Sequence, residues 1–208
     1  MIEAWYIRHG ESEANAGLAT EDPQAIPLTQ AGREQAYKAS LAFEHAPTLI
    51  VTSRYTRAMQ SAQFTIDRFP QVPVETWDVH EFTYLSTAIL GKTTMKERRP
   101  IVQAYWDRCD PTYIHGEGAE SFEDLICRAK KLDEQIRAVD NRFIVIFGHG
   151  FVMKMILWAN LLGSFETITM GNFHAFQKSF EIPNCAIFKA EYHPGKTLFS
   201  GLITDHLR

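Results

Sequence analysis

The stretch Ile2–Asn15, IEAWYIRHGESEAN, decides how this chain folds. Its first half is an almost unbroken apolar run, which is typical of a strand buried on both faces of a parallel sheet. Such a strand delivers the residues after it to the carboxyl edge of the sheet, where open α/β folds bind ligands. Those residues are Arg8, His9 and Gly10: a fixed cation, an imidazole and a residue that allows a sharp turn. The stretch therefore predicts an anion site that contains a nucleophile.

An ordinary loop histidine is the alternative interpretation of His9. From average residue usage, an Arg-His-Gly triplet arises by chance in roughly one chain in a hundred of this size. Adding Glu11, Ser12 and Asn15 at their spacings makes the combination about a thousandfold rarer. The pattern therefore favours a functional His9.

The overall composition is that of an ordinary globular enzyme. The chain has 208 residues, of which 45% are hydrophobic and 22% charged, so we expect one domain with a sizeable core. Its formal net charge of −4 gives no general attraction to nucleic acid or to an anionic membrane. Any anion must therefore be bound by a local cluster of cations, and we expect a small phosphorylated molecule as the partner. The oligomeric state is left open, with a dimer as one option.

The cysteines and the apolar runs bear on the compartment. Cys109, Cys127 and Cys185 are odd in number and far apart, which favours neither a disulfide framework nor a zinc site. The first residues do not form a signal sequence, because the first strand leads straight into the Arg-His pair. The longest apolar run, 151–162, is interrupted by Lys154 and is too short to span a bilayer. These features predict a cytoplasmic protein.

The order of the elements predicts a three-layer α/β/α fold with a mainly parallel central sheet, as a single domain over residues 1–208. After the first strand, we expect strands at 49–51, 74–77, 143–147, 186–192 and 198–204, the last two turned at Pro194-Gly195. Helices are expected from Thr29 to about Glu44, from Tyr55 to Phe69, from Thr94 to Arg108 with a break or start near Pro100, from a capping box at Ser121–Asp124 to about Asp140, and over 151–162 up to Gly163.

Residues 78–118 are the least regular part of the chain. Insertions of this kind usually cover an active site, so we expect 82–118 to form a helical insertion, the roof segment, that selects the substrate. The basic cluster of this segment either contacts a second anionic group of the substrate or forms a solvated helix face; it comprises Lys92, Lys96, Arg98 and Arg99.

Three predicted strands end in polar turns at one sheet edge, namely 8–10, 53–57 and 148–150. The guanidinium groups of Arg8 and Arg57 are shaped for bidentate binding of phosphate and keep their charge at working pH. The helix that starts after residue 54 adds backbone N–H donors. A metal held by His9 and His149 is disfavoured, because the flanking arginines would repel a cation. The three turns therefore predict a phosphate site.

Taken together, the motifs resemble the histidine phosphatase superfamily, specifically its phosphoglycerate-mutase-like group. The matching motifs are Arg8-His9-Gly10-Glu11-Ser12 with Asn15, Leu28-Thr29-x-x-Gly32-x-x-Gln35-Ala36, Ser53-x-x-x-Arg57-Ala58, a glutamate near position 81, Gly118-x-Glu120-Ser121-Phe122-x-Asp124, and Gly148-His149-Gly150. They follow the order of the family and span residues 8 to 150. The resemblance implies a phosphoglycerate-mutase-like fold and phosphoryl transfer that needs neither a metal nor another cofactor.

The resemblance also implies roles for the matching residues. His9 corresponds to the nucleophile that forms a phosphohistidine, which requires an unprotonated ring nitrogen. Glu81 corresponds to the group that protonates the leaving alkoxide and later activates water, and His149 completes the catalytic set. The implied substrate-binding residues are Arg8, Asn15, Arg57 and Gly150.

The assignment of Glu81 has competitors in the sequence. A solvated loop carboxylate is the alternative interpretation of this residue. Other glutamates could also supply the proton, and they are Glu3, Glu11, Glu75 and Glu97. Position 81 is preferred because it follows the strand at 74–77 and a short loop, as the acid of the family does.

Two departures from the family pattern bear on the activity. Arg54 and Tyr55 stand where a small residue and leucine are usual, and Arg54 either adds a cation at the pocket mouth or faces water. The stretch 81–85 lacks the arginine and histidine that follow the acid in glycolytic mutases. We therefore expect a metal-independent phosphatase acting on phosphomonoesters. The alternatives are a mutase and a low-activity phosphate-recognition module on the same fold.

Overall fold

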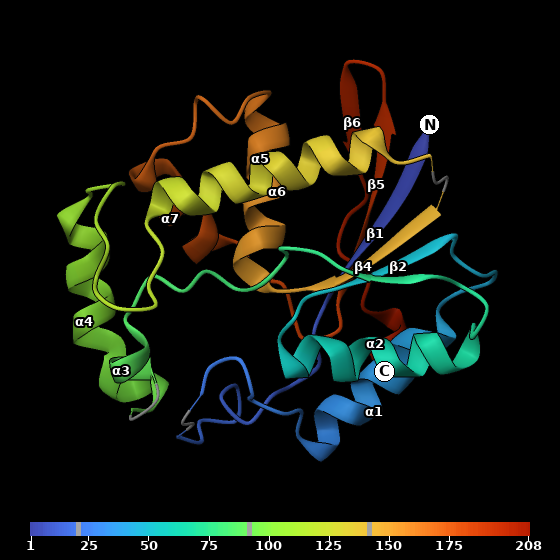
Figure 1. The fold of residues 1–208 in the computed structure, drawn as a ribbon, viewed down its shortest axis with the longest axis horizontal. Coiled ribbons are helices and arrows are strands. Elements are labelled where there is room, and N and C mark those ends of the chain that lie inside the picture. The colour runs from blue at the N-terminus through green and yellow to red at the C-terminus, as the bar shows by residue number, and fades with distance from the viewer. Residues whose placement is uncertain (20–21, 91–92, 141–142) are drawn as a thin grey trace.

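The computed structural model describes residues 1–19, 22–90, 93–140 and 143–208, so Lys92 of the basic cluster lies outside the described residues. Figure 1 shows a central sheet with helices on both sides, and α3 and α4 stand at one end of it. The strands are β1 (Ile2–Arg8), β2 (Leu49–Thr52), β3 (Val74–Thr76), β4 (Phe143–Gly148), β5 (Ile187–His193) and β6 (Lys196–Phe199). The helices are α1 (Gln30–Leu41), α2 (Thr56–Arg68), α3 (Thr87–Leu90), α4 (Met95–Arg108), α5 (Phe122–Ala138), α6 (Gly150–Leu162) and α7 (Met170–Ser179), and a 3-10 turn covers Asp205–Leu207.

The sheet has the strand order β3-β2-β4-β1-β5-β6. Its first four strands run parallel to one another, β5 runs antiparallel to β1, and β6 runs antiparallel to β5, which confirms the expected mainly parallel α/β fold. Arg8 at the end of β1 pairs with Gly148 of β4, and Thr52 at the end of β2 pairs with Phe147. The chain therefore leaves these three strands at the same level of one sheet edge.

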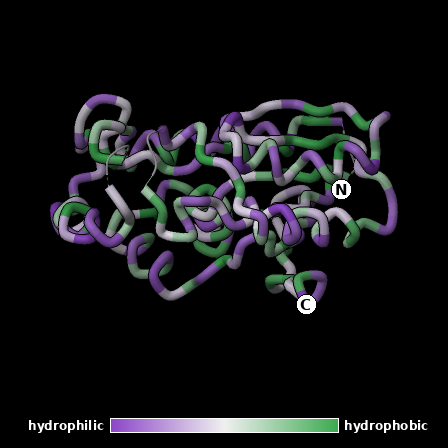
Figure 2. Tube along the Cα trace, turned by 90° about the horizontal axis from the view of Figure 1, so that it is seen from below, coloured by the Kyte–Doolittle hydropathy of each residue, from purple (hydrophilic) through white to green (hydrophobic). Residues whose placement is uncertain are grey.

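The central strands are buried on both faces. On β1, Tyr6 belongs to the core cluster that contains Phe122 of α5 and Val152 of α6, whereas its neighbour Ile7 packs in a second cluster with Ala62 of α2. This alternation follows from the two-residue period of a strand. Hydrophobic stretches run through the middle of the molecule, with hydrophilic ones at its margin (Figure 2). The burial of both faces explains the continuous apolar runs of β1 and β4.

The helix signals of the sequence are mostly confirmed. The Thr29 hydroxyl caps α1 by accepting from the Gly32 amide, and Ser121 with Asp124 forms the capping box of α5. Helix α6 ends before Gly163, which adopts a left-handed conformation with φ of 77°. Helices α1 and α5 end two to three residues earlier than expected, at Leu41 and Ala138.

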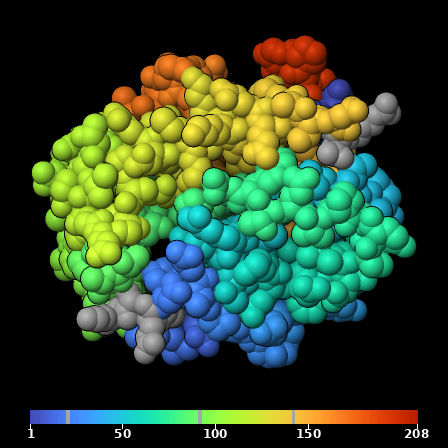
Figure 3. All heavy atoms as spheres, viewed as in Figure 1, coloured from blue at the N-terminus to red at the C-terminus, as the bar shows by residue number. Residues whose placement is uncertain are grey.

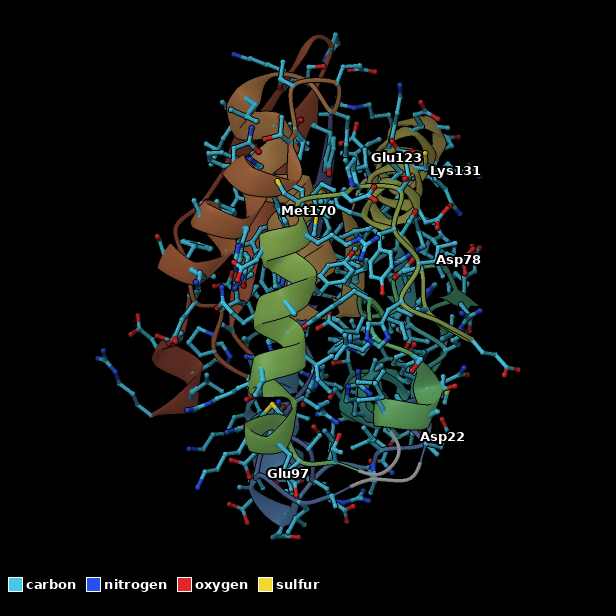
Figure 4. All side chains as sticks on the ribbon, turned by 90° about the vertical axis from the view of Figure 1, so that its left-hand side faces the viewer. Asp22, Asp78, Glu97, Glu123, Lys131 and Met170 are labelled. Carbon is cyan, nitrogen blue, oxygen red and sulfur yellow. The ribbon has the colours of Figure 1, made fainter. Side chains whose placement is uncertain are left out.

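Helix α4 corrects one expectation, because Pro100 neither starts nor interrupts it. The Thr94–Glu97 capping box starts the helix five residues before the proline. The carbonyl of Lys96 loses its helical partner at the proline, but Lys96 is exposed and water can replace that bond. Figure 4 looks onto α4, with Glu97 near its lower end and Met170, the first residue of α7, beside its upper end.

Two other elements differ from the sequence expectation. Helix α7 was not expected, since Gly171 and Asn172 have low helix propensity, but Thr169 caps it with Asn172. Strand β6 covers Lys196–Phe199 rather than 198–204, because the tight turn at Pro194-Gly195 starts pairing at once. Among the described residues, no helix combines the length and the apolar character needed to cross a bilayer.

Candidate active site

The structure brings the three polar turns together around His9. Its imidazole ring lies with its centroid 5.0 Å from that of His149, and its Nε2 atom lies 3.2 Å from Nε of Arg57. All three side chains are buried. The imidazoles of His9 and His149 and the guanidinium of Arg57, which follow three different strands, therefore lie close together.

The hydrogen bonds of His9 define its tautomer. Nδ1 lies 2.7 Å from the carbonyl oxygen of Gly10, which can only accept, so Nδ1 carries the proton. Nε2 of the neutral ring then holds a free electron pair, toward which Arg57 Nε donates. Burial, followed by the charges of Arg57 and Arg8, lowers the pKa of His9 well below its ordinary value. The ring is therefore kept neutral and nucleophilic at Nε2.

The two arginines are held by backbone carbonyls. Arg57 Nη1 donates to the Pro23 carbonyl at 2.8 Å, and its guanidinium lies over the Tyr55 ring at 4.9 Å. Arg8 Nη1 donates to the Ile182 carbonyl at 2.6 Å, whereas its buried Nε has no partner among the described residues. Burial lowers the pKa of both arginines, but a guanidinium remains charged at working pH.

His149 presents a second unpaired donor. Its Nε2 lies 3.0 Å from the Ser53 hydroxyl, and that hydroxyl accepts from the Tyr55 amide. The hydroxyl proton can therefore go to Nε2, which leaves the proton of the neutral ring on Nδ1. Nδ1 is buried without a partner within the described part of the chain. Because buried polar atoms are rarely unpaired, Nδ1 and the Nε of Arg8 indicate that a ligand with acceptor oxygens belongs here.

The carboxylate of Glu81 lies on the other side of this volume. Its Oε1 accepts from the amides of Phe82 and Phe151, each at 3.0 Å, so that it caps the start of α6. A Cβ built on Gly150 would lie 3.9 Å from both Arg8 Nε and Glu81 Oε2. Gly150 therefore leaves open the space between the cation and the second carboxylate oxygen.

The other four glutamates have other partners. Glu3 and Glu75 accept from the indoles of Trp5 and Trp77, each two residues further along the chain. Glu97 belongs to the α4 capping box, and Glu11 accepts from the Thr29 hydroxyl. Among these five glutamates, Glu81 is the one whose negative charge raises the pKa of both Arg8 and Arg57, against the effect of burial.

The loop after His9 is fixed by two glycines in close contact. A Cβ on Gly10 would lie 2.3 Å from the Gly32 carbonyl oxygen, and a Cβ on Gly32 would lie 2.0 Å from that of Glu11. The amide of Gly10 also donates to the Ser61 hydroxyl at 2.9 Å. Because Gly10 and Gly32 have no side chains, the loop after His9 can pack its backbone directly against the start of α1, where Gly32 of the Leu28–Ala36 motif lies. Ser61 was not singled out from the sequence.

Asn15 is engaged within the same loop. Its Oδ1 accepts from the Ser12 amide and hydroxyl and from Nδ2 of Asn184, which also donates to the His9 carbonyl at 2.9 Å. A phosphate contact by Asn15 stays a prediction. Asn184 lies far along the chain with no motif around it, so sequence reasoning did not find it.

Arg128 braces the loop that carries Glu81. Its Nη1 donates to the carbonyls of Asp78 and His80, at 3.1 and 2.8 Å. Its Nη2 donates to Glu120 at 2.7 Å, and Glu120 in turn accepts from the Thr83 amide. Glu120 belongs to a motif noted in the sequence, but nothing in the sequence pointed to Arg128.

Three cavities are lined by residues that neighbour this cluster. One of about 600 Å³ is lined by Arg8, Glu81, Gly150 and Lys154. A second, of about 540 Å³, extends from Glu81 under α4. The third, of about 240 Å³, is lined by Arg54, whose side chain is exposed. Figure 3 shows a hollow between the green roof segment and the blue and cyan segments.

Two further expectations concerned the backbone amides at the start of α2 and the basic cluster of the roof segment. The structure places them at the site only in part. The Thr56 amide at the start of α2 donates to the Gln24 carbonyl and is not open to a ligand. Arg98 and Arg99 line the second cavity. Within the described ranges, no group of three or more His, Cys, Asp or Glu side chains that could hold a metal ion is found.

Comparisons with known proteins place the chain in a family. The sequence model of the histidine phosphatase superfamily (branch 1) matches residues 4–203, and the chain belongs to this superfamily. An adenosylcobalamin/alpha-ribazole phosphatase of Escherichia coli (strain K12) is 27% identical over 174 residues, which are 78% of this chain and 80% of that protein. Its counterpart from Salmonella typhimurium is 25% identical over 168 residues, 75% and 78% of the two chains.

Solved structures share the fold. A phosphoserine phosphatase mutant of Entamoeba histolytica in complex with phosphoserine has a TM-score of 0.77 and 20% identity, with all of both chains covered. A mycobacterial glucosyl-3-phosphoglycerate phosphatase has a TM-score of 0.73 and 20% identity, with 97% of this chain and 98% of that one covered. These likenesses establish the phosphoglycerate-mutase-like architecture.

Proposed function

We propose that this protein is a phosphatase that hydrolyses phosphomonoesters through a phosphohistidine on His9. The observation that carries the proposal is the tautomer of His9, whose Nδ1 proton is bound by Gly10 while Nε2 faces the guanidinium of Arg57. Membership of the superfamily and the phosphatase relatives support the reaction class. No metal has a part in the proposed reaction.

In the first half-reaction, Nε2 of His9 attacks phosphorus and the bond from phosphorus to the alcohol oxygen breaks. Arg8, Arg57 and Nδ1 of His149 bind the phosphoryl oxygens and stabilise the charge of the transition state. At an effective dielectric constant of about 20, one cation at 4 Å contributes roughly 4 kcal/mol of Coulomb energy. Glu81, through Oε2, gives its proton to the leaving alkoxide.

In the second half-reaction, the Glu81 carboxylate accepts a proton from water, and the hydroxide so formed attacks phosphorus. The bond from phosphorus to His9 Nε2 breaks, and the neutral imidazole and the protonated Glu81 are restored. The products are the alcohol and inorganic phosphate. The stretch 81–85, which lacks the charged residues of the glycolytic mutases, supports water rather than a sugar acid as the acceptor.

The test is phosphate release from an aryl phosphate by the wild-type protein and by His9→Ala. We expect steady release that the variant loses, and a phosphorylated peptide containing His9 when turnover is quenched and the acid-labile phosphate is kept at alkaline pH. A chelator should leave the rate unchanged. Phosphate on a serine would contradict the mechanism, and phosphate binding without turnover would favour a recognition module.

The mutase alternative is separated by the fate of the phosphate. With 3-phosphoglycerate as substrate and its bisphosphorylated form as primer, we expect inorganic phosphate and no 2-phosphoglycerate. Formation of the isomer at a rate similar to phosphate release would favour the mutase.

A further inference from the structure

The second cavity, of about 540 Å³, is apolar and lies directly beside Glu81. We call it the roof pocket and define it by Tyr84, Leu90, Val102, Trp106, Phe151 and His174. These side chains come from the loop before α3 and from α3, α4, α6 and α7. The volume suits a small organic group, since pockets for such ligands span about 300–1,000 Å³.

The roof pocket adjoins the cavity beside Arg8. Glu81 and Phe151 line both this pocket and the cavity that contains Arg8 and Gly150. A proton donor has to reach the oxygen of the leaving alcohol, so that alcohol departs on the Glu81 side of the phosphate. The cavity near Arg54 does not include Glu81 in its lining. Of the two cavities that Glu81 lines, the one beside Arg8 is polar and also has Lys154 and Glu181 in its lining, so the geometry directs an apolar organic part toward the roof pocket.

Aromatic side chains that pack on one another form much of the pocket wall. The Trp106 ring is stacked on His174, with centroids 4.4 Å apart and planes at 15°, and it is nearly parallel to Phe151, at 6.2 Å and 9°. Tyr84 lies 5.8 Å from Trp106 between their centroids. Such walls favour a planar apolar group, because offset stacking adds to the effect of removing apolar surface from water.

The rim of the pocket is positively charged. Arg98 Nη1 is engaged by the carbonyls of Leu90 and Thr93, at 3.1 and 2.8 Å. Arg99 and Lys178 line the pocket and are exposed. Among the described lining residues, Glu81 is the single acidic side chain. A cationic substituent would therefore be repelled, whereas a neutral or anionic one is accommodated.

We propose that the roof pocket binds the alcohol portion of the substrate and that this portion is a planar, apolar group that is neutral or anionic. The proposal rests on the proposed phosphatase function and specifies its substrate class. At the rim of the pocket, the positive charge then comes from Arg99 of the roof segment and from Lys178 of α7.

The test compares esters of primary alcohols, so that the demand on the proton donor is similar. We expect kcat/KM for benzyl phosphate to exceed that for glycerol 3-phosphate by at least about tenfold, from the transfer of one ring out of water. A 4-carboxybenzyl ester should be preferred over a 4-(aminomethyl)benzyl ester, and Arg99→Glu with Lys178→Glu should reverse that order. Equal kcat/KM for benzyl and glycerol phosphates would overturn the proposal.

A pocket-filling variant locates the effect. Val102→Phe should reduce the ratio of kcat/KM for benzyl phosphate to that for glycerol 3-phosphate about tenfold. Ala104→Phe places the same ring on an exposed position of α4 outside the pocket lining and should keep the wild-type ratio. An unchanged ratio in Val102→Phe, or an equal reduction in Ala104→Phe, would contradict the roof pocket as the binding site.

A binding measurement separates this proposal from the proposed function. Benzylphosphonate and methylphosphonate do not require turnover, and isothermal titration calorimetry gives their affinities. We expect benzylphosphonate to bind at least about tenfold more tightly, and Val102→Phe to abolish the difference. If the difference is found without turnover of any ester, the phosphatase function fails while the pocket assignment stands. Equal affinities together with turnover would overturn the pocket assignment alone.

Discussion

The proposed phosphate site and the roof pocket are built on different principles. We call the first the phosphate cluster and define it by Arg8, His9, Arg57 and His149; Glu81 lies between it and the roof pocket. The cluster is polar and comes from strand ends, where the register of Arg8 with Gly148 aligns the turns. The roof pocket is apolar and comes from helices and a loop beyond the sheet edge. A shift of one residue in the register of a sheet would turn the side chains of a strand to the other face. Substitutions in the helices beside the sheet have no such effect. Under the proposed function, we therefore expect the chemistry to depend on the sheet edge and the choice of substrate to depend on the roof pocket.

The largest effect is expected inside the phosphate cluster. Arg57→Gln should reduce kcat by about 10²–10³, because it removes a fixed charge and a donor that act on the transition state. The measurement is steady-state kinetics with benzyl phosphate. Arg54→Gln is the matched control: it removes the same charge from an exposed position three residues away, and we expect less than about a threefold change. Equal losses in the two variants would remove the distinction between the cluster and its surroundings.

The loop that holds the nucleophile should be the next most sensitive feature. In Gly32→Ala the new Cβ meets a carbonyl oxygen at 2.0 Å, so we expect a loss of about 1–3 kcal/mol in the free energy of unfolding. Gly171→Ala is the control within a helix, since its Cβ meets no atom within 4 Å, and alanine should stabilise α7 by up to about 1 kcal/mol. Urea denaturation gives both values. A stable Gly32→Ala would show that the loop is less tightly held.

Arg128 tests the link between the two regions, because it braces the loop that carries Glu81. We expect Arg128→Met to reduce kcat/KM for benzyl phosphate about tenfold, through misplacement of the proton donor. The loss of kcat/KM should be smaller with 4-nitrophenyl phosphate, because its leaving group departs without a proton and because kcat/KM does not include the later hydrolysis step, in which Glu81 serves both substrates alike. Lys131→Met, an exposed position of α5, is the control and should change neither rate. The same loss with both substrates would assign Arg128 a structural role alone.

The smallest effect is expected in the pH dependence of stability. Burial and neighbouring cations lower the pKa of His9 and of His149 well below their ordinary value. Below about pH 6.5, these histidines are therefore protonated in the unfolded chain but stay neutral in the folded chain. Their contribution to the free energy of unfolding is fully present above that pH and is lost as the pH falls below it. Each of these histidines contributes up to about 1.4 kcal/mol per pH unit.

Urea denaturation between pH 7.5 and 5.5 measures this slope. His149→Gln should make the slope shallower by the contribution of one histidine, whereas His45→Gln, at an exposed position, should leave it unchanged. Stability that does not depend on pH over this range would contradict the neutral, buried state of His9 and His149.

Much of the fold follows from local signals. The runs of β1 and β4 indicated burial on both faces, and Thr29, Ser121 and Gly163 marked helix ends, because each acts on backbone groups within a few residues. Helix α7 was missed, since its weak local propensity is offset by packing against α4 and α6. The end of β6 depends on hairpin pairing, which a pattern of single residues does not contain.

The sequence by itself determined the residues of the phosphate cluster, because turns that follow parallel strands share an edge and the motifs specify which residues stand there. Only the tertiary structure decided which glutamate faces Arg8, that Ser61, Asn184 and Arg128 support the cluster, and that an apolar pocket opens beside Glu81. These features depend on contacts between residues far apart in the chain. Distances across space are set by the packing of helices on the sheet, and no local pattern encodes them.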